Sequence, residues 1–204
     1  MLVWLLAVGM ISASLGAGVA IARLPVGTSE IGRKSLHVVG AFGAIALSFM
    51  VPLADVALLM ALMSVVIALS HALRWPPRLY SDERRGYGDI LLPVGALAAA
   101  LLSPDLSVFV CAMLVVGVSD ALAGLVGRRF ATRPIWPHYC AKTYLGSATF
   151  FVVTALLCAA LLPVAWYLAI LLALLLSGVE YFSPLGSDNL LLPLVVSLSA
   201  QYLL

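Results

Sequence analysis

Eight apolar runs separated by short polar or proline-containing connections dominate this sequence. The runs lie at 2–22, 36–51, 55–73, 90–102, 106–126, 145–162, 164–180 and 189–204. A membrane-spanning helix needs about 20 apolar residues. Backbone groups in lipid must be hydrogen-bonded internally, so runs without strand-like alternation are expected to be helices. Only 10% of the residues are charged, against about 25% in soluble domains. We therefore expect a single all-α domain over 1–204, a polytopic transmembrane bundle of about seven or eight spans with no separate soluble domain.

The basic residues lie in three of the connections between these runs. They are Arg23, Arg33, Lys34, Arg74, Arg78, Arg84, Arg85, Arg128, Arg129, Arg133 and Lys142. The positive-inside rule assigns such loops to the cytoplasm. We expect a multi-pass protein of the cell membrane whose polar site faces the cytoplasm. The net charge of +2 is too small to indicate nucleic-acid binding.

Three local features carry smaller expectations. The segment 28–36 reads as a short helix at the membrane interface, with Thr28 or Ser29 as its N-cap. Asp55 and Asp105 look like helix caps on the opposite side. Within the charged loop before residue 90, the piece Gly86–Asp89 is the part that we expect to reach a site.

The first candidate constellation is the segment Arg33-Lys34-Ser35-Leu36-His37. On a helix, Arg33 and His37 are four residues apart and share a face. The simpler interpretation is a pair of basic anchors at a helix start.

The second constellation surrounds Asp120, inside the run 106–126. A carboxylate at membrane depth costs roughly 2.5–3.5 kcal/mol or more, so it needs a partner and usually has a function. Gly117, Gly124 and Arg128 share its helical stripe. Nothing within one turn can neutralise Asp120, so we expect its partner to be a metal or a group on another helix, such as Lys142 or Arg33. The alternative is close helix packing through small residues.

The third constellation, Lys142-Thr143-Tyr144-Leu145-Gly146-Ser147, opens the run 145–162. A lysine beside hydroxyl groups and the free amides of a helix N-terminus can bind phosphate. An ordinary capped helix start is the alternative.

The fourth constellation is Glu180 together with Asp188 and Asn189, which flank the connection between the last two runs. Hard cations such as Mg²⁺ prefer carboxylate and carbonyl oxygens together with phosphate. Alternatively, Asp188 is an N-cap and Glu180 is interfacial. Taken together, the carboxylates, cations and helix starts suit a metal-bound polyphosphate, because phosphoryl transfer depends mostly on positioning and charge neutralisation.

The pieces RKSLH, SDALAGLVGRRF and KTYLGS and the ending E…DNLLLP, in this order over residues 30 to 195, resemble the polyprenol kinase family. That family contains CTP-dependent dolichol, phytol and diacylglycerol kinases, and is distantly similar to the phosphatidate cytidylyltransferases. The resemblance implies transfer of the γ-phosphate of CTP to a lipid hydroxyl with a divalent metal, usually Mg²⁺.

The resemblance also implies a set of site residues. We expect Asp120, Lys142, Glu180 and His37 to be catalytic, and Asp120, Glu180 and Asp188 to bind the metal. The residues expected to bind nucleotide and phosphate are Arg33, Lys34, Gly124, Gly127, Arg128, Arg129, Thr143, Gly146, Ser147 and Asn189. The chain departs from the family pattern at Ser119, Ala131 and Leu145, where members often have glycine, glycine and an acidic residue. The last departure bears on nucleotide preference.

The leading hypothesis is therefore a kinase for a membrane lipid alcohol, preferably an isoprenoid alcohol such as phytol, farnesol or a polyprenol. The alternatives are a CTP-dependent diacylglycerol kinase, a cytidylyltransferase that forms a CDP-lipid, and, from a different class, a small membrane transporter. The expected partners are the lipid alcohol, CTP and membrane lipids, with no nucleic acid. An oligomer is compatible with the sequence but not indicated by it.

Overall fold

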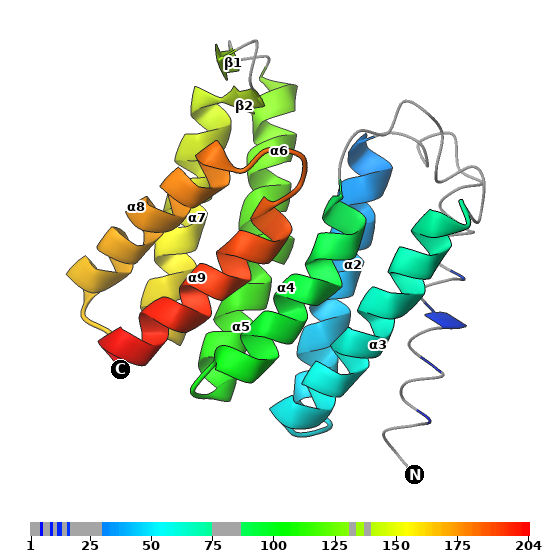
Figure 1. Cartoon of the computed structure of the whole chain (residues 1–204). Helices are drawn as coiled ribbons and strands as arrows, with labels where there is room; N and C mark the ends of the chain where they lie inside the picture. Colours follow the sequence, from blue (N-terminus) through cyan, green and yellow to red (C-terminus); the bar gives the residue numbers. More distant parts are fainter. Residues whose placement is uncertain are drawn as a thin grey trace.

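A computed structural model shows the protein as a bundle of helices that lie side by side (Figure 1). The structure describes residues 30–74, 87–130, 134–136 and 140–204, with a few single positions near the N-terminus. The predicted run 2–22, the caps Thr28 and Ser29 and most of the loop before residue 87 lie outside the described residues. The all-helical class is confirmed.

The described helices follow the apolar runs closely. They are α2 (Glu30–Ser48), α3 (Leu53–Ala72), α4 (Gly88–Leu102), α5 (Leu106–Leu114), α6 (Asp120–Arg129), α7 (Tyr144–Leu161), α8 (Trp166–Phe182) and α9 (Asp188–Leu203), with a π-helical segment, η2 (Val115–Ser119), between α5 and α6. Most boundaries fall within a few residues of the predicted ones, because the runs end at proline or polar residues.

The segment 28–36 was expected to be a short helix at the membrane interface. From Glu30 onward it is helical and forms the first part of α2, which runs unbroken to Ser48 because no proline or turn sequence interrupts it. The expectation that Asp55 caps a helix is wrong, since Asp55 lies in the first turn of α3, whose N-cap is Pro52. Asp105, in contrast, does cap α5, and its side chain accepts a hydrogen bond from the backbone N–H of Val108.

A short hairpin joins α6 to α7, where the sequence predicted only a loop. Its strands, β1 (Pro134–Trp136) and β2 (Cys140–Thr143), pair antiparallel. The hairpin lies at the top of the bundle in Figure 1, at the same end as the start of α2 and the end of α6.

Among the residues that the structure describes, three helical stretches are long and apolar enough to cross a membrane: Leu53–Ala72, Leu106–Arg129 and Tyr144–Leu161. Large apolar side chains such as Leu156, Leu171 and Leu174 are 58–65% exposed. Polar side chains, including Asp120 and Glu180, are buried inside the bundle. An apolar exterior around a polar interior is typical of a membrane protein with an internal site. The count of seven or eight spans stays a prediction.

The π-helical segment η2 directly precedes α6, the helix that begins with Asp120. π-Bulges are rare and often occur at functional sites. Within η2, Gly117 faces α2 so closely that a Cβ atom there would lie 2.8 Å from the Cβ of Ala41. This contact brings α2 against η2, one helical turn before Asp120.

Helices α4 and α9 also approach closely, and this contact fixes the start of α9. A side chain at Gly95 would collide with the backbone oxygen of Asn189. Pro193, four residues after Asn189, has no N–H to bond that oxygen. Gly95 thus lets α4 cover a stretch of α9 backbone that lacks its usual helical hydrogen bond.

Candidate active site

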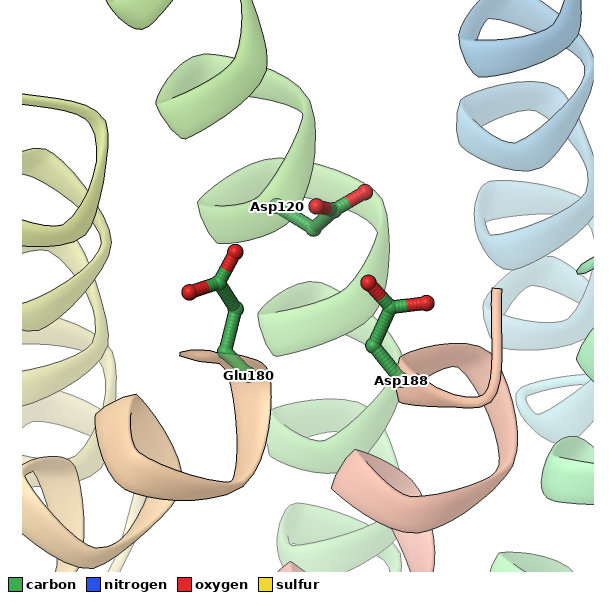
Figure 2. Close-up of side chains that lie close together, drawn as sticks. All are labelled: Asp120, Glu180 and Asp188. Atoms are coloured by element: carbon green, nitrogen blue, oxygen red, sulfur yellow. The ribbon is translucent and has the colours of Figure 1, made fainter. Parts of the chain in front are cut away.

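Three carboxylates from three helices meet inside the bundle (Figure 2). Asp120 begins α6, Glu180 lies near the end of α8, and Asp188 begins α9. One oxygen of each carboxylate can be chosen so that all lie within 4.8 Å of one another. All three residues are buried, with 8%, 2% and 9% of their surface exposed. We call this group the acidic cluster.

The acidic cluster is recessed from the end of the bundle. Asp120 is nine residues before Arg129 at the end of α6, which corresponds to about 13 Å along the helix axis. In Figure 1 the connection between α8 and α9 lies lower than the top of α6 and α7. A ligand of the cluster would therefore lie between helices and below the hairpin.

Lys142 supplies a positive charge to the cluster. Its ammonium group donates to Glu180 Oε1 and, at 3.1 Å, to Asp188 Oδ2. Burial would lower the pKa of Lys142, but the carboxylates of Asp188, Glu180 and Asp120 outweigh burial and raise it above the usual lysine value of 10.5. Lys142 is therefore a firmly protonated cation in this structure.

Lys142 also lies directly before the amino end of α7. Thr143 caps this helix, because its side-chain oxygen accepts from the backbone N–H of Gly146 at 3.1 Å. The capped helix start that was the alternative interpretation of this segment is therefore present. Only Thr143 separates the lysine that binds the cluster from the first turn of α7, where the amides of Tyr144 and Leu145 have no acceptor within the helix.

Lys34 is the partner of Asp120. Its ammonium group is 3.1 Å from each carboxylate oxygen of Asp120 and 2.9 Å from the backbone oxygen of the same residue. The sequence predicted a partner on another helix and named Lys142 or Arg33 as examples. The side chain of Arg33 is outside the described part of the structure, and the bonded group is Lys34.

Three predicted phosphate-binding glycines make room for these groups. A side chain at Gly124 would collide with the end of Lys34, one at Gly127 would lie 2.5 Å from Thr143 Oγ1, and one at Gly146 would lie 2.9 Å from the backbone oxygen of Ala123. These glycines let α6 and α7 pack tightly beside the cluster. Their binding of phosphate stays a prediction.

His37 joins three helices next to the cluster and is 4% exposed. Its Nε2 lies 3.1 Å from Asp89 Oδ1 on α4, and its Nδ1 lies 3.4 Å from the amide nitrogen of Asn189 on α9. An amide nitrogen only donates, so Nδ1 accepts and Nε2 carries the proton that Asp89 accepts. Asn189 also donates to the backbone oxygen of Gly88.

The piece Gly86–Asp89 was expected to reach a site. Asp89 itself was not among the predicted site residues, although an acid opening an apolar helix was a usable signal.

Two predicted phosphate ligands lie away from the cluster. Arg128 Nε donates to the backbone oxygen of Gly124 in its own helix, and both Arg128 and Arg129 are exposed at the end of α6. The Ser147 hydroxyl is buried and has no hydrogen-bond partner among the described residues.

The cluster fits a hard divalent cation. Carboxylate oxygens are the ligands that Mg²⁺ prefers, and three carboxylates converge here. Moreover, Glu180 Oε2 is buried without a hydrogen-bond donor from any described residue. Buried polar atoms are rarely left unpaired, so this oxygen is available to a ligand.

Comparisons with known proteins support the resemblance. No family model matches the chain, and no solved structure matches it. The chain is 29% identical over 210 residues to a phytol kinase from Synechocystis sp., in an alignment that covers 96% of this chain and 90% of that protein. The similarity thus extends over almost the whole of both chains, and it supports the resemblance to the polyprenol kinase family.

Proposed function

We propose that the protein transfers the γ-phosphate of CTP to the hydroxyl group of a membrane isoprenoid alcohol. The observation that carries this proposal is the recessed acidic cluster, with Lys142 bound to it at the amino end of α7. A buried group of carboxylates beside a cation and free helix amides suits a metal-bound polyphosphate. The apolar exterior of the bundle suits an acceptor that is held in a membrane.

We assign one set of residues to the metal and another to the polyphosphate. Asp120, Glu180 and Asp188 would hold a divalent cation, usually Mg²⁺, which neutralises charge on the phosphate oxygens when bound. Lys142 and the first turn of α7, from Thr143 to Gly146, would bind the polyphosphate. Lys34 keeps the Asp120 carboxylate oriented toward the cluster.

The reaction forms one bond and breaks one. The acceptor oxygen attacks the γ-phosphorus, and the bond from that phosphorus to the β–γ bridging oxygen breaks, so that CDP leaves. The hydroxyl proton passes to a carboxylate of the cluster. Glu180 is our candidate, because only one of its two oxygens accepts a hydrogen bond within the described structure, whereas both oxygens of Asp120 accept from Lys34. One oxygen of Glu180 could then bind the metal and the other take the proton.

The choice of donor and acceptor rests on similarity. The relative in Synechocystis sp. is a phytol kinase, and the motifs resemble a CTP-dependent family. Leu145 stands where that family often has an acid, and this departure bears on the nucleotide preference. We further propose that the protein crosses the membrane several times, with the basic end of the bundle and its site facing the cytoplasm.

A labelling experiment tests the reaction and its alternatives together. Purified protein in detergent with Mg²⁺ receives CTP labelled at either the γ- or the α-phosphorus, together with phytol, farnesol, diacylglycerol or phosphatidic acid. We expect γ-label, and no α-label, in phytol or farnesol. Label in diacylglycerol alone would show that the acceptor is diacylglycerol and not an isoprenoid alcohol. Transfer of α-label to phosphatidic acid, with release of pyrophosphate, would identify a cytidylyltransferase instead.

A further inference from the structure

Lys142 occupies the position that a divalent cation would need. Its ammonium group binds an oxygen of Glu180 and an oxygen of Asp188, two of the three carboxylates that converge in the acidic cluster. A hard cation placed among these carboxylates would use the same oxygens. The ammonium and the metal would then be in contact, and like charges at such a distance repel strongly inside a protein.

The lysine nevertheless does not complete the cluster. Glu180 is 2% exposed, and its Oε2 has no hydrogen-bond partner in the described part of the chain, although its Oε1 accepts from Lys142. One ammonium therefore leaves a buried carboxylate oxygen unpaired in the middle of the cluster. A cation with a higher charge and more ligands would satisfy that oxygen.

We propose that Lys142 and the divalent cation are alternative occupants of the acidic cluster. Without metal, the ammonium group holds Glu180 and Asp188 together. When the metal binds, the ammonium leaves these oxygens and turns to the polyphosphate at the amino end of α7. This exchange deepens the proposed function and rests on its metal–nucleotide site.

The local structure allows this movement for Lys142 but not for Lys34. Lysine has a flexible four-carbon stem, and Lys142 lies one residue before the cap of α7. Within the described structure, its ammonium group bonds only to the carboxylates of Glu180 and Asp188. Lys34 also binds the backbone oxygen of Asp120, and its stem lies against Gly124. We therefore expect Lys34 to stay in place when the metal binds.

Metal binding without nucleotide tests the exchange directly. The dissociation constant of Mn²⁺ is measured by electron paramagnetic resonance for the full chain in detergent, as wild type, Lys142→Met and Arg74→Met. Removal of the competing charge should tighten Mn²⁺ binding of Lys142→Met by about tenfold or more. Arg74→Met removes an exposed charge just after α3, and its Mn²⁺ affinity should stay within about threefold of wild type because exposed charges are screened. Unchanged or weaker Mn²⁺ binding by Lys142→Met would overturn the proposal.

A second measurement uses the wild-type protein, in case Lys142→Met does not fold. Reductive methylation followed by mass spectrometry reports how accessible each lysine amine is. Saturating Mn²⁺ should increase the methylation of Lys142 and leave that of Lys34 unchanged. Equal or lower methylation of Lys142 with Mn²⁺ contradicts the exchange.

The two proposals can fail separately. Mn²⁺ binding with the expected lysine response, but no phosphoryl transfer from any nucleotide, would refute the kinase proposal and leave the exchange standing. Phosphoryl transfer by the wild type, together with an unchanged Mn²⁺ affinity in Lys142→Met, would refute the exchange and leave the kinase proposal standing.

Discussion

Lys34 donates to both carboxylate oxygens of Asp120 and to its backbone carbonyl oxygen, all within 3.1 Å. One side chain on α2 thus fixes both the orientation of the acid and the position of the turn that bears it. Only 13% of the Lys34 side chain and 12% of the Asp120 side chain are exposed. A buried pair of this kind is costly to break from one side, because the remaining charge loses its partner.

The first prediction concerns this pair. Asp120→Asn keeps the shape of the acid and removes its charge, so phosphoryl transfer should fall by about 10²-fold or more if the acid binds the metal or acts on the acceptor. Transfer rates and melting temperature are measured on the same preparations. Activity within a few-fold of the wild type would show that Asp120 is not catalytic, and the site would then have to be built around Glu180 and Asp188.

The second prediction concerns Gly124, over which the end of Lys34 lies. Gly124→Ala should displace the ammonium from Asp120 and lower activity by about tenfold, since overpacking a tight contact typically costs 1–3 kcal/mol. Gly43→Ala is the matched control, because a Cβ atom at that position of α2 meets nothing within 4 Å. That control should be neutral or slightly stabilising, as alanine favours helix. Equal behaviour of the two variants in activity and melting assays would argue against the contact.

Much of this arrangement was predictable from the sequence. The acid inside an apolar run, the small residues on its stripe and the basic loops indicated one polar site. The helix boundaries followed from proline and polar punctuation. Two glycines of the predicted stripe, Gly117 and Gly124, both face α2, whereas Arg128 is exposed at the end of α6.

The pairings were not predictable, because they depend on side-chain reach between helices far apart in sequence. Lys34 and Asp120 are 86 residues apart, and Lys142 and Glu180 are 38 residues apart. The π-helical segment before Asp120 has no local sequence signal that we recognised. The packing of Gly95 on α9 likewise depends on the neighbouring helix rather than on its own sequence.

The third prediction concerns pH. The folded state holds the pKa of Lys142 above its ordinary value of 10.5, because carboxylates surround the ammonium. The protonated lysine therefore contributes stability that is fully present below 10.5 and is lost as pH rises through the higher folded pKa. Melting temperatures in EDTA, from about pH 7 to pH 11, should fall at the alkaline end. Lys142→Met should melt lower at neutral pH and show less of this alkaline decline. Parallel curves for the two proteins would mean that another group causes the decline.

The fourth prediction concerns orientation in the membrane. Phe130, after the basic end of α6, is 64% exposed, and Pro104, in the turn between α4 and α5, is exposed at the opposite end. In a Cys140→Ser background, Phe130→Cys should resist a membrane-impermeant maleimide in intact cells, and Pro104→Cys should react. Cys111 and Cys158 are buried and should stay unlabelled. Labelling of Phe130→Cys from outside would reverse the predicted orientation.

The fifth prediction concerns His37, which the sequence placed among the catalytic residues. Both of its ring nitrogens have partners, Asp89 and Asn189, so the geometry favours a positioning residue over a base. Asn189 follows Asp188 directly, and its backbone N–H donates to the Asp188 carboxylate. His37→Gln can still donate to Asp89 and should keep activity within about tenfold, below the 10²–10⁴-fold typical of a lost general base.

His37→Leu removes both hydrogen bonds, and it should lower the melting temperature and activity together, because buried polar partners are then left unpaired. The measurements are kcat, KM and melting temperature for both variants. A loss of 10²-fold or more in kcat for His37→Gln, with an unchanged melting temperature, would instead identify His37 as the group that takes the proton.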